Sequence, residues 1–341
     1  MKGFASDNYS GCSPEIMLAI QQANEHHQPS YGADVFTQQA ISIFKEHFGE
    51  NAEVFFVMNG TGANVTALQA ICRPYEAVIS SHMAHLNTDE CSAPEKLGGF
   101  KIKDVYTEDG KLTIEHIKPL LGGRGVHQAV ARVITITQST EIGTLYTQEE
   151  IRTLANFAHE NGLYLHVDGA RIANAAVSLG VSFKEMLVDT GVDVVSFGGT
   201  KNGMMMGEAI IFLNPALAEN FGFIRKQSMQ LLSKMRYVGA QFVAYFKNDL
   251  WKKNAAHANQ MAQLLANRLR EVPAVSITQK VEANGVFAIL PREITPALQE
   301  VFPFYIWNEE TNEARLMLSF DSTEEEVERF VDTINTLLLN R

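Results

Sequence analysis

The 341 residues are 46% apolar and 20% charged, which excludes a disordered or collagen-like chain and is long enough for about two domains. Acidic residues outnumber basic ones by 39 to 28, and the resulting net charge of −11 disfavours nucleic acid as a partner. The three cysteines, Cys12, Cys72 and Cys91, lack the number and spacing of a disulfide framework or a zinc site, so we expect no metal and a reducing compartment, the cytoplasm.

No segment is predicted to direct the chain to a membrane. The first eight residues turn polar at once and lack an apolar stretch, so we expect no secretory signal. Residues 54–72 carry no charge, but Asn59, Gly60 and Gly62 interrupt the run and exclude a spanning helix. We therefore expect no membrane segment.

From about residue 50 to residue 215, short apolar or β-branched runs alternate with longer segments of helical period. This alternation predicts a parallel sheet, whose ligands gather at the carboxyl ends of the strands. The predicted strands are Glu53–Val57, Ala77–Ser80, Lys103–Tyr106, Ala131–Thr137, Leu163–Val167, Val192–Phe197 and Ala209–Leu213. The helices between them include Thr61–Ile71 and Gln148–Asn161, the second with Thr147 as its N-cap and Glu150 three residues beyond it.

After Pro215 the pattern changes. A long helix is predicted from Leu217 to about Lys247. The further predicted elements are a helix Leu250–Arg270, a strand Gly285–Leu290, a helix Pro296–Val301, a strand Arg315–Phe320 and a final helix Glu324–Leu339, capped by Ser322 or Thr323. We therefore predict an N-terminal arm and large domain over residues 1–245 and a small α+β domain over residues 246–341.

One apolar strand ends in a carboxylate. Asp168 and Gly169 follow the run that begins at Leu163, so Asp168 is expected to project from the carboxyl edge of the sheet, where a ligand would lie. Side chains alternate along a strand, so His166 would face the same side as Asp168. The alternative is a loop aspartate that caps the next helix.

A lysine follows the next apolar strand. Lys201 lies between Gly198-Gly199-Thr200 and the run Met204–Met206. A lysine with little room for solvation has its pKa lowered, which frees the amine to form a Schiff base. The alternatives are a loop lysine that points to water and methionines that fill gaps in the core.

The two residues have the separation of one strand–helix–strand unit, so the sheet edge would bring them together. A carboxylate for a protonated ring nitrogen and a lysine for an aldehyde carbon fit pyridoxal phosphate. The turn 59–64 follows a predicted strand and opens a helix, which suits a phosphate group. Val65 replaces the third glycine of a dinucleotide fingerprint and the P-loop lysine is absent, so an ordinary strand-to-helix turn is the remaining alternative.

These segments resemble the threonine aldolase family, within the pyridoxal phosphate enzymes of the aspartate aminotransferase fold (fold type I). The resemblance covers nearly the whole chain, and its specific parts are Asp168-Gly169-Ala170-Arg171 and Thr200-Lys201-Asn202. The supporting segments are Ser6-Asp7-Asn8, Tyr31-Gly32-Ala33-Asp34, Gly60–Asn64, Ala84-His85 with Glu90, Met235-Arg236 and Arg315. The resemblance implies an α/β large domain with a mostly parallel sheet and a smaller α+β C-terminal domain.

The resemblance also implies how the cofactor is held. Lys201 would bind pyridoxal phosphate covalently, Asp168 would pair with the ring nitrogen, and His85 would stack on the ring. Gly60 and Thr61 would bind the phosphate. Without the family, His85 is interpreted as a loop histidine that makes one hydrogen bond.

Arginines complete the implied site. Ser6, Arg171 and Arg315 would receive the α-carboxylate of the substrate, a task that suits planar guanidinium groups. Arg171 would also contact the cofactor, and Arg236 of a neighbouring subunit would bind its phosphate. If the resemblance is set aside, Arg236 is interpreted as a solvated arginine on a long helix, and Arg315 is interpreted as an ordinary charged residue at the start of a strand.

The implied activity is that of a lyase that cleaves L-threonine, L-allo-threonine and related β-hydroxy-α-amino acids to glycine and an aldehyde. His85, or a water molecule held by it, is the expected base for the β-hydroxyl, with Glu90 as the second candidate. The alternatives are another reaction of the cofactor, such as β-elimination, phenylserine cleavage or transamination, and a non-catalytic protein on the same scaffold. Because the family's active sites lie between subunits, a homodimer or homotetramer is implied.

Two segments depart from the family pattern. Many relatives carry a histidine or an aromatic residue in the loop after the central strand, where this chain has Gln138–Gly143. This difference leaves open the preference between threonine and allo-threonine. The glycine-rich run that precedes the phosphate arginine is here Leu232-Ser233-Lys234-Met235.

Overall fold

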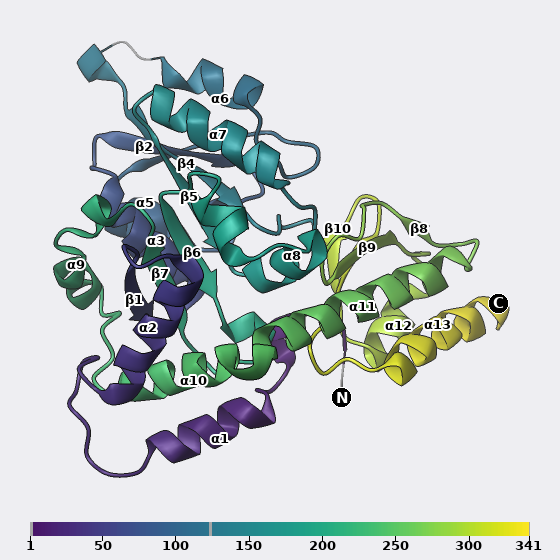
Figure 1. The fold of residues 1–341 in the computed structure, drawn as a ribbon. Coiled ribbons are helices and arrows are strands. Elements are labelled where there is room, and N and C mark those ends of the chain that lie inside the picture. Colours follow the sequence, from purple (N-terminus) through teal and green to yellow (C-terminus); the bar gives the residue numbers. More distant parts are fainter. Residues whose placement is uncertain (1–2, 123–124, 341) are drawn as a thin grey trace.

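The computed structural model describes residues 3–122 and 125–340, so Met1, Lys2 and Arg341 of the two predicted domains lie outside the described residues. Within these ranges, seven strands form one sheet in the order β1-β7-β6-β5-β4-β2-β3 and four form a second in the order β10-β11-β9-β8. Figure 1 shows the second sheet lying to one side of the first, next to the C-terminal helix α13.

The large sheet is mostly parallel. Its strands are β1 (Glu53–Val57), β2 (Glu76–Ser81), β3 (Lys101–Val105), β4 (Val130–Thr137), β5 (Tyr164–Gly169), β6 (Val194–Gly198) and β7 (Glu208–Phe212). Strands β2 to β6 run parallel to one another, whereas β7 pairs antiparallel with both β6 and β1. The predicted fold class is therefore confirmed, with its antiparallel pairs confined to one side of the sheet.

Helices cover both faces of this sheet. They are α1 (Pro14–Ala23), α2 (Val35–Phe48), α3 (Gly60–Ile71), α4 (His85–Thr88), α5 (Ala93–Gly98), α6 (Ile114–Leu121), α7 (Gln148–Glu160), α8 (Ile172–Leu179), α9 (Phe221–Gln227) and α10 (Arg236–Phe246). Alternate residues of β6 belong to different apolar cores: Val195 packs in one with Phe44 of α2, and Val194 in the other with Leu68 of α3. This alternation explains why the strand reads as a continuous apolar run.

Most predicted boundaries agree with the structure to within two residues. Strand β3 begins at Lys101 and ends at Val105, two residues before and one before the predicted limits. Thr147 caps α7 through a capping box with Glu150, as predicted, and of the two candidate caps for α13 (Glu324–Leu339), Thr323 is the one used.

The single long helix predicted from Leu217 to Lys247 is wrong. Helix α9 ends at Gln227, Met229 has a φ of 62°, and α10 begins only at Arg236. The chain leaves the helix because it makes tertiary contacts there: the Gln230 side chain accepts a hydrogen bond from the amide of Met58. Helical periodicity alone carries no information about such a contact.

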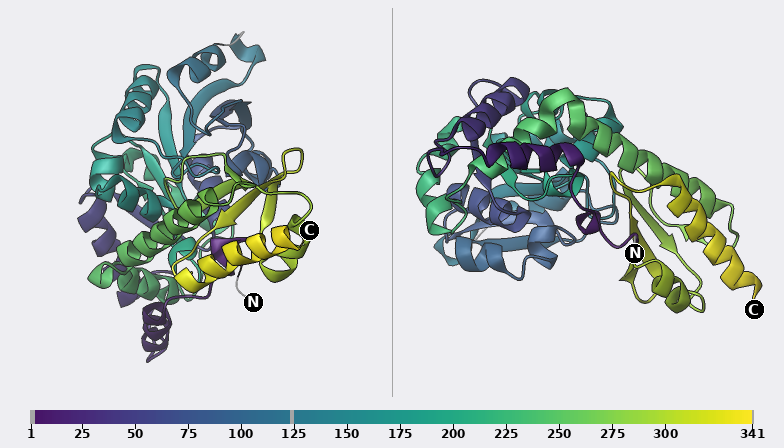
Figure 2. Two further views of the ribbon diagram at one scale, coloured as in Figure 1. Left: turned by 90° about the vertical axis from the view of Figure 1, so that its right-hand side faces the viewer. Right: turned by 90° about the horizontal axis from the view of Figure 1, so that it is seen from below.

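The second sheet has an apolar core of its own. Its elements are α11 (Leu250–Arg270), β8 (Ser276–Ile277), β9 (Gly285–Ile289), α12 (Thr295–Val301), β10 (Tyr305–Asn308), β11 (Glu313–Met317) and α13. Helix α11 contributes Trp251 to the core of the large sheet and Leu265 to that of the small one, and Figure 2 shows it running from one to the other. Because the two sheets have separate apolar cores, we propose that the chain divides into two domains between residues 245 and 246, with α11 as the helix that connects them.

The N-terminal arm lies against the small sheet. The amide of Phe4 donates to the carbonyl of Pro303, and the amide of Met317 donates to the carbonyl of Phe4. The Phe4 ring packs edge-on against Phe330 at a centroid distance of 5.2 Å. Asp7 then pairs with Arg171, which follows β5, and accepts a hydrogen bond from Asn284, which precedes β9, so this part of the arm lies between the two sheets.

Among the helices of the described residues, none combines the length and the apolar character that crossing a membrane requires.

Candidate active site at the carboxyl edge of the sheet

A cavity of about 380 Å³ lies where the parallel strands end. Its walls come from the turns after β1 and β2 and from the ends of β5 and β6. Of the residues predicted from the sequence, those that line it are Gly60, Thr61, His85, Asp168 and Lys201. Residues that are distant along the chain thus share one cavity.

Asp168 lies at the end of β5, 4% exposed, opposite Ser196 in β6. Its Oδ2 accepts a hydrogen bond of 2.8 Å from Asn64 Nδ2, and its Oδ1 accepts one of 3.1 Å from the amide of Ala170. The residue at the N-cap of the following helix is Arg171, and it makes no side-chain capping bond. His166 is buried on the same strand, where its Nε2 lies 2.9 Å from Ser196 Oγ.

Lys201 lies in a short 3₁₀ turn, Thr200–Asn202, that follows β6. Burial lowers the pKa of its amine, and the nearby Arg171 charge lowers it further. Gly198 and Gly169 allow the end of β6 to approach the Asp168 turn closely. A Cβ at Gly198 would lie 2.4 Å from the carbonyl oxygen of Ala170, and one at Gly169 would lie 2.9 Å from that of Ser196. The amine is thus held in a crowded site where its neutral form is favoured.

A buried acid supports this turn. Glu208, the first residue of β7, lines the same cavity and accepts a 2.7 Å hydrogen bond from the amide of Gly199. Burial raises the pKa of Glu208 from 4.5 to about 7. Sequence reasoning missed this residue, and its only signal was a carboxylate within an otherwise apolar strand.

Glu208→Gln is expected to remove a pH-dependent loss of stability. In the folded protein Glu208 keeps its proton up to about pH 7, whereas in the unfolded chain it releases the proton near pH 4.5. As pH rises between these values, the free energy of unfolding therefore falls by about 3 kcal/mol because of Glu208. Denaturant unfolding at several pH values should show the variant matching the parent at pH 4.5 and exceeding it at pH 8. The exposed Glu53→Gln is the control, and a difference that does not change with pH would contradict the prediction.

The turn after β1 forms the other end of the cavity. Asn59 caps α3, and its Oδ1 accepts a 2.7 Å hydrogen bond from the amide of Gly62. The amides of Gly60 and Thr61 belong to the first turn, where the helix itself offers no acceptors, and the helix dipole favours an anion there. The geometry suits the phosphate group predicted from the sequence.

His85 begins the short helix α4 and lines the cavity. Its Nδ1 lies 2.8 Å from Glu90 Oε1, and its backbone amide donates to Glu141 Oε1 at 2.8 Å. The hydrogen bond with Glu90 raises the pKa of His85. The ring of His85 is therefore held by one carboxyl group and its backbone by another, so the one hydrogen bond of the ring is made to a buried acid.

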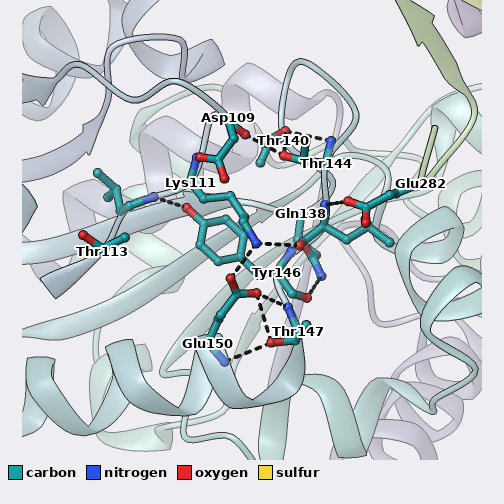
Figure 3. Close-up of polar contacts among 12 residues, drawn as sticks. Asp109, Lys111, Thr113, Gln138, Thr140, Thr144, Tyr146, Thr147, Glu150 and Glu282 are labelled. Atoms are coloured by element: carbon teal, nitrogen blue, oxygen red, sulfur yellow. Dashed lines mark hydrogen bonds and ion pairs between the residues drawn. The ribbon is translucent and has the colours of Figure 1, made fainter. Parts of the chain in front are cut away.

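Glu141 lies in the loop that departs from the family pattern. A polar network holds this loop in place (Figure 3): the Gln138 side chain exchanges two hydrogen bonds with the backbone of Tyr146, at 2.8 and 3.0 Å. Glu282 also accepts a hydrogen bond of 3.0 Å from the amide of Leu145. Burial raises the pKa of Glu141 to about 7, so this carboxyl is partly neutral at physiological pH.

The predicted carboxylate-binding residues do not line the cavity, but they lie near one another. Arg171 forms a bidentate ion pair with Asp7, at 2.6 and 3.0 Å. Ser6 Oγ accepts a 3.2 Å hydrogen bond from the amide of Asn8 and thereby caps the 3₁₀ turn that carries Asp7. The sequence did not predict the role of Asp7, although Asp7 belongs to the segment Ser6-Asp7-Asn8 that supports the family resemblance.

Arg315 approaches the same group from β11. Its guanidinium lies 5.6 Å from the ring centre of Tyr305 and 5.2 Å from that of Trp307, and one nitrogen is 3.5 Å from the carbonyl oxygen of Ala5. Burial lowers the pKa of Arg315, and the positive charge of Arg171 lowers it further. Two guanidinium groups thus lie close enough to repel each other, an arrangement that an anionic ligand would stabilise.

Arg236 lies apart from this cavity. It begins α10, and its Nη1 donates to the carbonyl of His26 at 2.8 Å. A single chain therefore does not bring Arg236 to the Gly60 turn.

Comparison with known proteins supports one interpretation of this site. Residues 3–292 match the beta-eliminating lyase family. A low specificity L-threonine aldolase of Pseudomonas aeruginosa is 45% identical over 338 residues, which cover 98% of this chain and 97% of the relative. A solved threonine aldolase structure from Leishmania major superposes with a TM-score of 0.93 at 31% identity, over 99% of this chain and 100% of that one. Mouse CSAD shares the fold, with a TM-score of 0.78 at 14% identity over 98% and 83% of the two chains.

Proposed function

Since the chain belongs to the beta-eliminating lyase family and is similar to low specificity L-threonine aldolases along nearly its whole length, we propose that it is a pyridoxal phosphate-dependent aldehyde-lyase. Its substrates are L-threonine and L-allo-threonine, which it cleaves to glycine and an aldehyde. The observation that carries the proposal is that Asp168 and Lys201, from neighbouring strands, line one cavity.

The residues of the cavity fit this cofactor. The carboxylate of Asp168 matches a protonated ring nitrogen, and the Lys201 amine, whose pKa is lowered by burial, matches an aldehyde carbon. The amides of Gly60 and Thr61 match a phosphate at the N-terminus of α3, a helix of 12 residues. When bound, pyridoxal phosphate supplies an electron sink for the pair released as the Cα–Cβ bond breaks.

The protein's own residues select the bond that breaks. Arg171 and Arg315 would bind the α-carboxylate, with Ser6 beside them, and would thereby orient the substrate so that its Cα–Cβ bond is the one that breaks. His85 accepts the proton of the β-hydroxyl, directly or through water, as the aldehyde leaves. Asp168 would pair with the ring nitrogen and favour its protonated form.

A guanidinium would stabilise a phosphate there, and among the described residues no arginine lines the cavity. Arg236 of the partner subunit is proposed to supply it, as family resemblance suggests, so the working enzyme is a homodimer or a homotetramer. We propose the cytoplasm as its compartment, because the thiols of Cys12, Cys72 and Cys91 are free. Its role there is the formation of glycine in amino acid metabolism.

A substrate panel tests the proposal. The purified enzyme, loaded with pyridoxal phosphate, is incubated with L-threonine, L-allo-threonine, D-threonine and phenylserine, and the aldehyde and glycine are measured. We expect equal amounts of aldehyde and glycine from the L-substrates. The family name favours β-elimination as the second candidate, which would instead release a keto acid and ammonia.

Arg315→Lys is expected to raise KM for L-threonine about tenfold while kcat stays within about threefold. An ammonium makes one charge-assisted hydrogen bond where the guanidinium makes two, so binding weakens, whereas the charge of the lysine and the remaining Arg171 still orient the carboxylate. Steady-state kinetics of aldehyde release measure both constants. The matched control is Arg270→Lys, since Arg270 is exposed and contacts Asn267. An unchanged KM would exclude Arg315 from carboxylate binding.

A further inference from the structure

Three short contacts connect Asp168, the proposed partner of the ring nitrogen, with His85, the proposed base. Asn64 Nδ2 lies 2.8 Å from Asp168 Oδ2 and 2.9 Å from Glu90 Oε1, and that same Glu90 oxygen lies 2.8 Å from His85 Nδ1. Asn64 is 2% exposed, and Asp168 and Glu90 are 4% exposed. Water therefore does not screen the two carboxyl groups from each other.

The orientation of the Asn64 amide follows from its neighbours. An amide nitrogen has two hydrogens and a carboxylate can only accept, so Nδ2 offers one hydrogen to Glu90 and one to Asp168. The opposite orientation would press Oδ1 against two carboxylate oxygens. Among the described residues, Asn64 Oδ1 has no hydrogen-bond partner, so the hydrogen bonds of the amide are the two that Nδ2 makes.

We propose that Asn64 is a positioning residue: its amide donates to both Glu90 and Asp168, favours the charged form of Glu90, and through Glu90 sets His85 with Nε2 toward the cavity. The inference rests on the proposed function, which makes His85 the base. Because Nδ1 donates its hydrogen to Glu90, Nε2 is the nitrogen left to accept the proton of the substrate hydroxyl.

The charges around His85 determine how this arrangement titrates. Glu90, through its hydrogen bond, and the charge of Asp168 raise the pKa of His85, whereas burial and the charge of Lys201 lower it. Glu141 binds the backbone amide of His85, and Asp89 lines the same cavity. Burial raises the pKa of Glu90, and its hydrogen bonds from His85 and Asn64 lower it.

Two substitutions therefore have linked effects on the pKa of His85. In Glu90→Gln the charged partner is gone, so the pKa of His85 falls. In Asn64→Ala the carboxyl of Glu90 loses a donor and is protonated more readily near neutral pH, so the pKa of His85 falls by less. In the double variant His85 titrates as in Glu90→Gln, because residue 90 no longer has a carboxylate on which Asn64 could act.

The test is a histidine NMR titration of the cofactor-loaded enzyme, with the His85 signal assigned by its loss in His85→Asn. The pH dependence of kcat/KM is measured in parallel, and its acid limb should move to lower pH by the same amounts as the pKa of His85. Glu108→Gln, on an exposed turn, is the charge control. Circular dichroism monitors folding, and Asn64→Ser, which keeps one donor, replaces Asn64→Ala if the latter does not fold.

The outcomes separate the two proposals. If Asn64→Ala lowers kcat/KM equally in both backgrounds and leaves the pKa of His85 unchanged, Asn64 acts by packing alone and the inference is overturned. If the parent enzyme releases no aldehyde, the proposed function fails. The NMR titration would still decide whether Asn64 acts on His85 through Glu90.

Discussion

Lys201→Ala protein is expected to lose at least about 1,000-fold in kcat for aldehyde release from L-threonine, because among the described residues Lys201 is the one lysine that lines the cavity and can bind the cofactor covalently. Its cofactor should be removable by dialysis, whereas borohydride should fix the cofactor permanently to the parent protein. Aldehyde release and near-visible absorbance measure the two effects.

The control for this prediction is Lys252→Ala, an exposed lysine on α11. It should keep the activity of the parent and its absorbance. Lys201→Ala protein that still cleaves threonine at the parent rate would refute the assignment of Lys201, and with it the proposed use of the cavity.

Asp168→Asn is expected to lower kcat about 100- to 1,000-fold while KM for L-threonine changes little. The amide has nearly the same shape but no charge, so it no longer stabilises a proton on the ring nitrogen, and removal of one such electrostatic partner typically has a cost of this size. Steady-state kinetics distinguish the two constants, and the absorbance of the bound cofactor should persist because Lys201 is intact.

Asp104→Asn is the matched control, since Asp104 is an exposed acid on β3. It should leave both constants unchanged. If Asp168→Asn raised KM and left kcat intact, Asp168 would be a substrate-binding residue and its pairing with the ring nitrogen would be wrong.

Much of the fold follows from local sequence patterns. The β-branched runs and their intervening amphipathic segments predict the strands of the large sheet, and a capping box predicts the start of α7 at Gln148. The failure at residues 217–247 has a specific cause. Gln230 binds the amide of Met58, so a contact between segments distant along the chain ends the helix.

In the candidate site, too, some residues are predicted by local sequence patterns and others are identified only by tertiary contacts. Asp168 and Lys201 are recognisable because each follows an apolar strand and strand ends share an edge. The polar residues that hold the site together give no comparable signal. Asp7, which pairs with Arg171, and Asn64, which binds Asp168, do not come directly after an apolar strand that would mark them in the sequence. A polar residue acquires such a role only when folding removes water from around it.

The order of apolar and polar residues by itself determined the alternation of strands and helices, the carboxyl edge as the place for a ligand, and the acid and lysine that lie there, because these depend on periodicities within single segments. Tertiary structure alone decided that Asn64 lies between Glu90 and Asp168, that Asp7 holds Arg171, and that Arg236 lies away from the cavity. Those contacts join residues far apart along the chain, and their strength comes from the burial that only the assembled fold provides.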